Sequence, residues 1–364
     1  MQSDQMRCLK WLACVLLLWG AGFVTAVGAD ASCQIDASVN NSGPLVKRLS
    51  ADCALAERET HAVSSAVVLD AIKKGRAVEL AGVIIKGDLL LDRLPLQAVR
   101  MRKGEPPVDR EASSGSTPVE IRSASSPITI RDSVVQGAIR HESEKGIFQF
   151  EGPLDLHGTL FKQRIDLSRS VFLRAVDLSD AQFEQETYWV QGQFGETLNC
   201  AGTKFGPRTR FHRSTFRGAV NCRGALFDGM AEFLETTFEQ RALFSNARFS
   251  LGTGFSGSRF FREVSFSDAI FSREVFFGFA RFEDKVSFAG AQFLDAADFS
   301  NAHFTRPDDL SKARFATPPV LAHARRVASE QDSAAGLPRG VQYAVTLGFL
   351  VAGALLLAYA YKMK

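Results

Sequence analysis

The sequence predicts an all-β solenoid, in which the chain winds into stacked coils around a narrow apolar core. Phenylalanine recurs every eleven residues from Phe150 to Phe315 without a miss. A second apolar series stands six residues after each of these phenylalanines, from Leu156 to Leu310. Apolar positions at alternating steps of six and five match neither an α-helix nor a flat strand. An unbroken period of this kind is typical of stacked repeats.

A small residue stands two positions before each phenylalanine of the first series from Phe161 onward. From Thr159 to Ala313 this position holds only Ala, Ser, Thr or Gly. Side chains alternate along an extended segment, so the small residue points inward together with the phenylalanine. One large and one small inward group per face would fill a narrow core without voids. We therefore expect short straight segments that meet at corners such as Asn246-Ala247 and Asp268-Ala269.

At these residues the chain resembles the pentapeptide-repeat family. The unit of that family is a small residue, a polar residue, Leu or Phe, and two further residues, as in Ala-Asp-Phe-Ser-Asn at 297–301. The resemblance implies a right-handed quadrilateral parallel β-helix with four short faces per coil. It covers 150–315 strongly and 77–140 weakly. Every second unit carries one additional residue, so four faces would span two eleven-residue repeats instead of four five-residue units.

Residues 1–29 are predicted to be a secretory signal peptide. Arg7 and Lys10 precede an apolar stretch, and small residues follow it. We expect cleavage after Ala29, and retention of the segment as an uncleaved anchor is the alternative.

Residues 30–76 are expected to form a small helical cap at the N-terminal end of the solenoid. A solenoid exposes an apolar cross-section at each end, so a terminal cap is expected. The stretch from Leu55 to Lys74 is rich in Ala and Val, ends on two lysines and is followed by Gly75. This is a favourable arrangement for the C-terminus of one helix.

The remaining domains follow from composition. Residues 77–149 are expected to form irregular first coils, with a flexible insertion at 101–126 where Pro, Ser and Gly concentrate. The regular β-helix is expected over 150–315. Residues 316–340 are expected to be a cap and linker, with a short helix near 320–331.

Residues 341–361 are predicted to be a transmembrane helix. They form an apolar stretch in which only Gln342 and Thr346 are polar. Lys362 and Lys364 follow this stretch. A stretch of this length spans a bilayer of about 30 Å hydrocarbon thickness, and the lysines favour a cytoplasmic location for the tail, 362–364. The sequence therefore predicts a single-pass membrane protein whose β-helix lies on the periplasmic or cell-surface side.

The predicted mature chain keeps four cysteines, an even number that suits an oxidising compartment. Cys33 and Cys53 flank the N-terminal piece and are candidates for a disulfide. Cys200 and Cys222 occupy inward positions two repeats apart, which is one coil if the coil has four faces. The strand spacing would permit a disulfide between them, whereas parallel side chains in one column favour two unbridged thiols. The sequence leaves both alternatives open.

No catalytic, cofactor-binding or metal-binding motif is predicted. The six histidines are scattered, and the sequence contains no nucleophile elbow, phosphate loop or dinucleotide fingerprint. The array also runs from 150 to 315 without an insertion, so it offers little concavity in which a substrate could be desolvated. We therefore expect no enzymatic activity and no cofactor.

The charges of the array are nearly balanced, with 20 Lys or Arg and 21 Asp or Glu over 151–315. DNA mimicry, which the resemblance would allow, requires a strongly acidic surface, so no nucleic-acid partner is expected. One local cluster contains only basic charges and supplies candidate partner-facing residues: Lys204, Arg208, Arg210, Arg213, Arg217 and Arg223. Wrapped around one coil they would point to several faces, which favours an ordinary solvated surface over a phosphate-binding patch. Arg259, Arg281 and His303 recur at every second repeat and should form a ladder on one outer face.

These features together predict a non-enzymatic, membrane-anchored extracytoplasmic scaffold. Its flat faces would bind an unidentified protein or envelope polymer, and the C-terminal helix would bind the membrane. The alternative is the ectodomain of a sensor or of a channel-associated membrane complex. A single span with a three-residue tail favours the scaffold.

Overall fold

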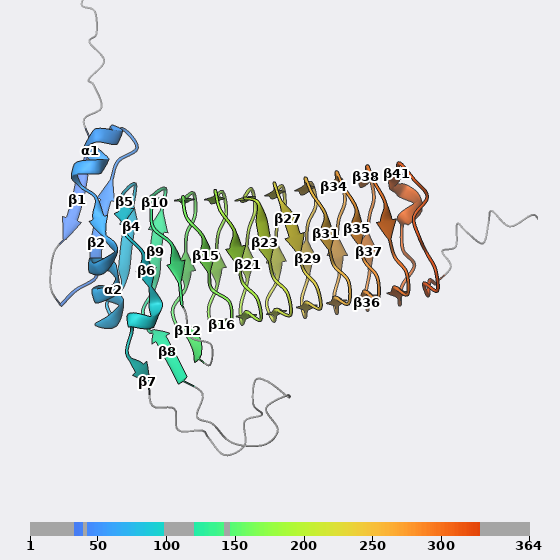
Figure 1. Ribbon diagram of the computed structural model, residues 1–364, viewed down its shortest axis with the longest axis horizontal. Coiled ribbons are helices and arrows are strands. Elements are labelled where there is room, and N and C mark those ends of the chain that lie inside the picture. Colours follow the sequence, from blue (N-terminus) through green and yellow to red (C-terminus); the bar gives the residue numbers. More distant parts are fainter. Residues whose placement is uncertain (1–32, 39–41, 98–119, 142–145, 328–364) are drawn as a thin grey trace, which may run out of the picture. The chain divides into compact units, whose positions relative to one another are not determined.

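The computed structural model describes residues 33–327, apart from 39–41, 98–119 and 142–145. Within these residues the chain forms a parallel β-solenoid whose short strands stack into four sheets (Figure 1). The predicted signal peptide, transmembrane helix and tail lie outside the described residues. In the described part, no helix is long and apolar enough to cross a membrane.

Each coil passes through four sheets in the order A, B, C and D. Sheet A contains β1 (Ile35–Ser38), β2 (Leu45–Leu49), β4 (Val78–Ala81), β9 (Ile128–Arg131), β13 (Leu154–Asp155), β17 (Val176–Asp177), β21 (Leu198–Asn199), β25 (Val220–Asn221), β29 (Ala242–Leu243), β33 (Val264–Ser265) and β37 (Val286–Ser287). Sheet B contains β3 (Val63–Ser64), β5 (Ile84–Lys86), β10 (Val134–Val135), β14 (Leu160–Phe161), β18 (Gln182–Phe183), β22 (Lys204–Phe205), β26 (Leu226–Phe227), β30 (Arg248–Phe249), β34 (Ile270–Phe271), β38 (Gln292–Phe293) and β41 (Arg314–Phe315). Sheet C contains β6 (Leu89–Leu90), β11 (Ile139–Arg140), β15 (Ile165–Asp166), β19 (Thr187–Tyr188), β23 (Arg208–Arg210), β27 (Met230–Glu232), β31 (Thr253–Gly254), β35 (Val275–Phe276) and β39 (Ala297–Asp298). Sheet D contains β7 (Leu96–Gln97), β8 (Glu120–Ala124), β12 (Gly146–Phe150), β16 (Ser170–Phe172), β20 (Gln193–Phe194), β24 (Thr215–Phe216), β28 (Thr237–Phe238), β32 (Arg259–Phe260), β36 (Arg281–Phe282) and β40 (His303–Phe304).

The period of the sequence sets the register of the sheets. Strand partners in the regular coils lie two eleven-residue repeats apart, as in the pairing of Phe249 with Phe227 on one side and Phe271 on the other. The pairs are parallel, except for β1 with β2 and β7 with β8. Because the chain visits all four sheets between such partners, two repeats close one coil.

Both apolar series point into the core. The first series alternates between sheets B and D, and the second lies just after the strands of sheets A and C. Phe216, Phe238 and Phe260 are at most 1% exposed. Rings of successive coils stack, so that Phe249 lies 4.8 Å from Phe227 and 4.8 Å from Phe271 between ring centroids. The predicted inward orientation is confirmed.

The small inward residues complete the core and also link the coils. Where this residue is Thr or Ser, its hydroxyl can donate a hydrogen bond to a carbonyl of the preceding coil. Thr203 donates to Leu178 over 2.7 Å, and Ser214 donates to Trp189 over 2.6 Å. A buried hydroxyl is acceptable here because a backbone acceptor stands within reach.

Two of the four corners of each coil adopt a left-handed backbone conformation. At the corner between sheets A and B these residues are Gly82, Asp132, Gly158, Asp180, Gly202, Gly224, Asn246, Asp268 and Gly290. At the corner between sheets C and D they are Arg169, Gln191, Arg213, Glu235, Gly257, Phe279, Asn301 and His323. The first column consists of the residues that tolerate a positive φ most readily, whereas the second contains bulky side chains.

The N-terminal piece differs from the single helix expected over Leu55–Lys74. It contains the β1–β2 hairpin and two short helices, α1 (Leu55–Thr60) and α2 (Ser65–Lys73), with β3 between them. The helix is interrupted because Val63 is buried and pairs with Ile85 of sheet B. Ser64 then begins a new helix, and its hydroxyl accepts a hydrogen bond from the Ala66 amide over 3.2 Å.

The early coils are more regular than expected for 77–149. The chain passes through β4, β5 and β6, a short 3₁₀ helix (Leu91–Arg93) and β7, and returns at β8. The insertion expected over 101–126 extends too far toward the C-terminus. Glu120–Ala124, at its end, forms a strand that pairs in parallel with Gly146–Phe150. The rest of that insertion lies outside the described residues, except for 125–126, which connect β8 to the next coil.

The end of the array also differs from expectation. The described residues of 316–340 contain no helix, so the helix expected near 320–331 is not formed over 320–327. After a 3₁₀ turn (Leu310–Lys312) and β41, the chain continues the coil instead. Val320 bridges to Asp298 and Arg325 to His303, each across one coil. The open backbone groups of β39 and β40 offer partners that a helix would leave unpaired.

Replacing Ala247 by Leu tests the requirement for a small inward residue. Ala247 is fully buried, and it precedes the stacked ring of Phe249 by two positions. The larger side chain should overpack the coil and destabilise the solenoid by about 1–3 kcal/mol. Thermal and denaturant melts measure this change, with Ala296→Leu at an exposed position as the control. Equal melting of the two variants would contradict the assignment of Ala247 to the core.

Candidate anion-binding groove

The basic residues 204–223 do not form one patch. Lys204 lies on sheet B, Arg208 and Arg210 on sheet C, Arg213 at the next corner, Arg217 after sheet D, and Arg223 after sheet A. Three of them pair with acidic residues of neighbouring coils.

Arg208 lies 3.8 Å from Glu186, Arg210 lies 2.5 Å from Glu232, and Arg213 lies 2.8 Å from Glu235. The hydrogen bond from Arg213 lowers the pKa of the Glu235 carboxyl. The cluster is therefore a solvated, partly neutralised band around one coil.

The four cysteines divide into a bridged pair and two free thiols. Cys33 and Cys53 form a disulfide. Cys200 and Cys222 are buried and unbridged, so the possible disulfide between them is not formed in this structure. Their strands pair in register, which places the two side chains parallel in one column. Burial, followed by the contact with Cys222, raises the pKa of the Cys200 thiol well above its usual value. A buried, protonated thiol is a poor nucleophile and a poor metal ligand.

One further group of potential metal ligands lies near the disulfide. Cys33, Cys53 and Glu57 bring one ligand atom each within 4.8 Å of one another. The two sulfurs are bonded to each other, however, and a disulfide offers no thiolate to a metal ion. This group is therefore better explained by the disulfide than by a metal site.

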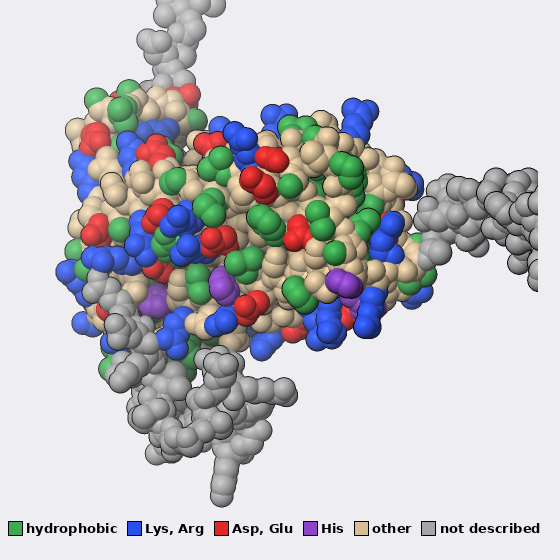
Figure 2. Space-filling view, turned by 45° about the vertical axis from the view of Figure 1, so that its right-hand side comes forward, with side chains coloured by type: hydrophobic (Ala, Val, Ile, Leu, Met, Phe, Trp, Pro, Cys, Tyr) green, Lys and Arg blue, Asp and Glu red, His purple; other side chains and the backbone are tan. Residues whose placement is uncertain are grey.

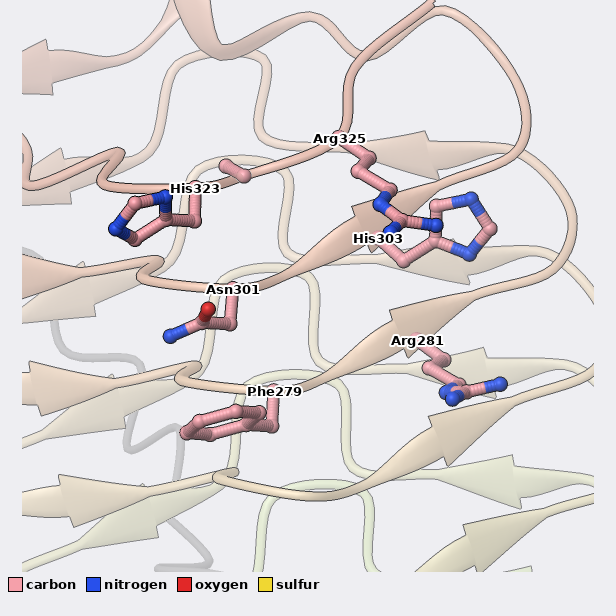
Figure 3. Close-up of a pocket in the computed structure, with 7 residues that line it drawn as sticks. Phe279, Arg281, Asn301, His303, His323 and Arg325 are labelled. Carbon is pink, nitrogen blue, oxygen red and sulfur yellow. The ribbon is translucent and has the colours of Figure 1, made fainter.

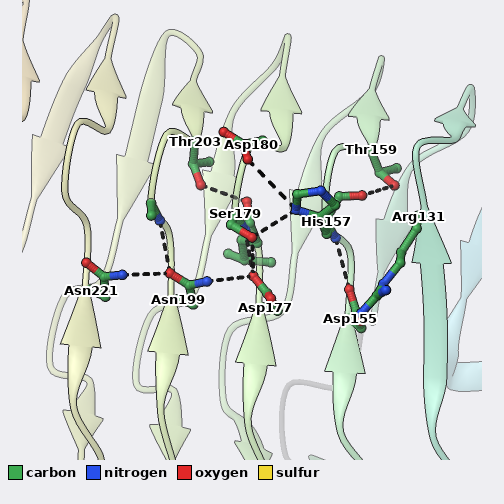
Figure 4. A network of polar contacts seen from close by, with 12 residues as sticks. Arg131, Asp155, His157, Thr159, Asp177, Ser179, Asp180, Asn199, Thr203 and Asn221 are labelled. Carbon is green, nitrogen blue, oxygen red and sulfur yellow. Dashed lines mark hydrogen bonds and ion pairs between the residues drawn. The ribbon is translucent and has the colours of Figure 1, made fainter.

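A ladder of polar side chains runs along the outer face of sheet A (Figure 4). The Asn221 amide donates to Asn199, and the Asn199 amide donates to Asp177, each over 3.0 Å. Arg131 donates to Asp155 over 2.7 Å at the N-terminal end of the ladder. Because these groups bind one another, the ladder joins successive coils and leaves few free donors for a ligand.

A hollow of about 710 Å³ opens on the surface of the last coils. It is lined by two parallel columns of side chains, which Figure 3 shows in one view. One column contains Phe279, Asn301 and His323, and the other contains Arg281, His303 and Arg325. Ala324 completes the lining. We call this the cationic groove.

Sheet D positions the second column. Arg281 pairs with Arg259 on one side and with His303 on the other, and His303 bridges to Arg325. Neighbouring members of the column are therefore separated by one strand spacing of about 4.8 Å. The expected ladder of Arg259, Arg281 and His303 is present, and it continues for one more coil.

The corner between sheets C and D positions the first column. Phe279, Asn301 and His323 have φ angles of 58°, 59° and 57°. Asn adopts this left-handed conformation readily, but it is strained for a bulky aromatic residue. Phe279 is also 65% exposed, so burial of its ring does not offset the strain. The same corner is left-handed in the preceding coils, as at Arg213 and Glu235, so this conformation belongs to the repeat, and the exposed aromatic ring is what distinguishes Phe279.

The cationic groove carries an excess of positive charge. Arg259, at its edge, is matched by Glu283 at 3.2 Å and lies over the Phe261 ring at 4.8 Å. Within the described residues, no carboxylate forms an ion pair with the Arg281 or Arg325 side chain. Lys and Arg side chains gather beside histidine near the C-terminal end of the array (Figure 2).

Stacked charges of one sign repel each other, so this arrangement costs stability in the absence of an anion. Acidic groups stand nearby without entering the groove. Asp308 is engaged by Arg326 at 2.7 Å, and Asp298 accepts a hydrogen bond from the Ser300 amide at 2.8 Å.

Half of this site could be found from the sequence. The two-repeat spacing identified Arg259, Arg281 and His303, and the same spacing extended past Phe315 would have identified Arg325. The corner column was missed, because Phe279, Asn301 and His323 share no residue type. The sequence did hold one signal for this column, because Phe279, Asn301 and His323 follow Gly257 at successive steps of two repeats.

The family model described as pentapeptide repeats (9 copies) matches residues 167–215 and 266–314. The second of these segments contains Phe279, Arg281, Asn301 and His303 of the cationic groove. A comparison with curated proteins found no match. The two matched segments and the four-sheet coil agree on a β-solenoid built from pentapeptide repeats.

Proposed function

We propose that this pentapeptide-repeat solenoid is a non-enzymatic interaction scaffold, anchored in a membrane and displayed on its extracytoplasmic side. The observation that carries the proposal is the filled core. Stacked rings and small side chains occupy the interior of the regular coils, as at Phe238 and Phe249 with 0% exposure. Binding by these coils therefore takes place on their outer faces, which short strands of two or three residues keep flat and regular.

The extracytoplasmic location is supported by the cysteines. A disulfide between Cys33 and Cys53 persists in oxidising compartments and is rare in the cytosol. The sequence features of 1–29 and 341–361 point to the same location, because they are those of an export signal and of a membrane span.

The absence of an enzymatic role is supported by the lining of the cationic groove. Its seven residues include two arginines and two histidines but no carboxylate, serine, threonine or cysteine. Such a set offers electrostatic attraction to an anion, and it places no hydroxyl or thiol beside a histidine that could activate it as a nucleophile. The proposed role is therefore binding.

The proposed topology predicts two results in cells. A reporter that works only in the cytoplasm, fused after Lys364, should be active, because 341–361 would span the membrane and leave the tail inside. Protease added to spheroplasts should digest the solenoid while the tail reporter stays intact. The control is a chain that lacks residues 1–29, whose solenoid should be protected. A tail reporter that behaves as exported would contradict the proposed span.

The scaffold role is tested by cross-linking in membranes followed by affinity purification of the full-length chain. A protein or envelope polymer that is cross-linked to outward positions of sheets A to D is the expected result. Recovery of a channel or receptor subunit as the stoichiometric partner would instead favour the ectodomain of a sensor or channel-associated complex. Failure of outward positions to cross-link to anything would contradict the scaffold.

A further inference from the structure

We propose that the cationic groove binds an acidic polysaccharide, laid along the axis of the solenoid. This inference rests on the proposed binding role and specifies the class of ligand that one site takes. The ligand chemistry is a chain of sugar rings that carry oxyanions, either carboxylates or sulfates.

The first argument is the arrangement of positive charge. Arg281, His303 and Arg325 stand on three successive coils, so their side chains form a row parallel to the axis. The two arginines are separated by two strand spacings, or about 10 Å. A single small anion would engage one of them, whereas a linear polyanion engages both. Arginine suits this task because its planar group binds oxyanions through two parallel hydrogen bonds.

The second argument is the parallel row of corner residues. Phe279 presents a ring beside Arg281 that is 65% exposed. The face of an aromatic ring is electronegative and attracts polarised C–H groups, such as those on the flat side of a sugar. Asn301 and His323 continue the row with groups that donate and accept hydrogen bonds, as hydroxyl-rich ligands require. The groove therefore offers charge on one side and contacts for sugar rings on the other.

The third argument concerns what the groove does with such a chain. Hydrolysis of a glycosidic bond generally requires a pair of carboxylic acids that flank the bond. The residues that line the groove include neither Asp nor Glu. The site therefore holds the polysaccharide without hydrolysing it, which agrees with a scaffold that attaches to an envelope polymer.

Binding to the purified full-length chain tests the proposal. The probes are polygalacturonate, which carries carboxylates, and dextran sulfate, which carries sulfates, with neutral dextran and inorganic polyphosphate for comparison. The variant R281E/R325E should weaken binding of at least one acidic polysaccharide by about tenfold or more, since it removes two charge-assisted contacts. The matched control is R248E/R314E, because both of these exposed arginines lie on sheet B. This control should change the affinity less than about twofold.

A second variant separates sugar recognition from attraction by charge alone. Phe279→Asn removes the ring and places at this corner the residue found one coil later, where φ is 59°. It should fold at least as well as the parent and weaken polysaccharide binding by about threefold or more. Its affinity for polyphosphate should not change.

Four results would each overturn the proposal. In the first, neither acidic polysaccharide binds. In the second, R248E/R314E weakens binding as much as R281E/R325E does. In the third, Phe279→Asn leaves polysaccharide binding intact, and in the fourth, single-stranded DNA of equal charge binds as tightly as the polysaccharides. If any of these results appears while cross-linking still recovers a partner on the outer faces, the groove inference fails and the scaffold role stands.

Discussion

Replacing Phe249 by Ala is expected to destabilise the solenoid by about 3–5 kcal/mol. The Phe249 ring is fully buried, and it stacks within 5° of parallel on Phe227 and within 2° on Phe271. Alanine removes both stacking contacts at once and leaves a cavity between two rings. The backbone of each coil is hydrogen-bonded to the next, so the neighbouring coils cannot collapse to fill it.

Thermal and urea-induced unfolding of the full-length chain measure this effect. Phe276→Ala is a suitable control, because Phe276 is 45% exposed on the outer face of sheet C. The control should change the free energy of unfolding by less than about 1 kcal/mol. Repeat proteins lose stability locally, so hydrogen exchange should rise most in the coils that flank Phe249. Equal effects of the two substitutions would contradict the assignment of Phe249 to the ring stack.

Removing the Cys33–Cys53 disulfide is expected to destabilise the N-terminal piece by about 3 kcal/mol, as estimated from loop closure. The bond joins residues 20 positions apart and closes the β1–β2 hairpin into a loop. Without it, the hairpin is held by the pairing of β2 with β4 and by the apolar contacts of Leu45 and Leu49. The loss should therefore be confined to the first coils, and the coils around Phe249 should keep their stability.

The measurement is hydrogen exchange of the N-terminal residues in the variant C33S/C53S and in the parent chain with and without reductant. Reductant should accelerate exchange in the parent and leave the variant unchanged, which separates the bond from other effects of reduction. Protection that does not change in either case would show that the disulfide adds no stability to this piece.

The repeat region was predictable from the sequence because the period of the apolar residues is also the period of the coil, with two repeats in each turn. Each coil repeats the same two apolar positions and the same small residue, so the orientation of Phe216 or Phe260 follows from its place in the series. The stacking of every second repeat follows in turn, which is why Arg259, Arg281 and His303 could be aligned in advance. The family resemblance supplied the number of faces, and the four sheets agree with it.

The ends were predicted less well because no period applies to them. The stretch from Leu55 to Lys74 has good helix-forming residues throughout, but Val63 gains more from pairing with Ile85 and from burial than a continuous helix would provide. Residues 320–325 continue the coil for a similar reason, since β39 and β40 present unpaired backbone groups. In both places, tertiary contacts outweigh local propensity.

The sequence by itself determined the solenoid, its register and its core, because a strict period leaves one way to bury sixteen phenylalanines. The tertiary structure alone decided which outward residues form a site. Phe279, Asn301 and His323 differ in type, and only the left-handed corner of the coil aligns them beside Arg281, His303 and Arg325. It also decided that Cys33 bonds Cys53 while Cys200 and Cys222 stay apart. Burial constrains inward residues at every repeat, whereas the outer face is free to vary, so a groove there becomes visible only once the coils are stacked.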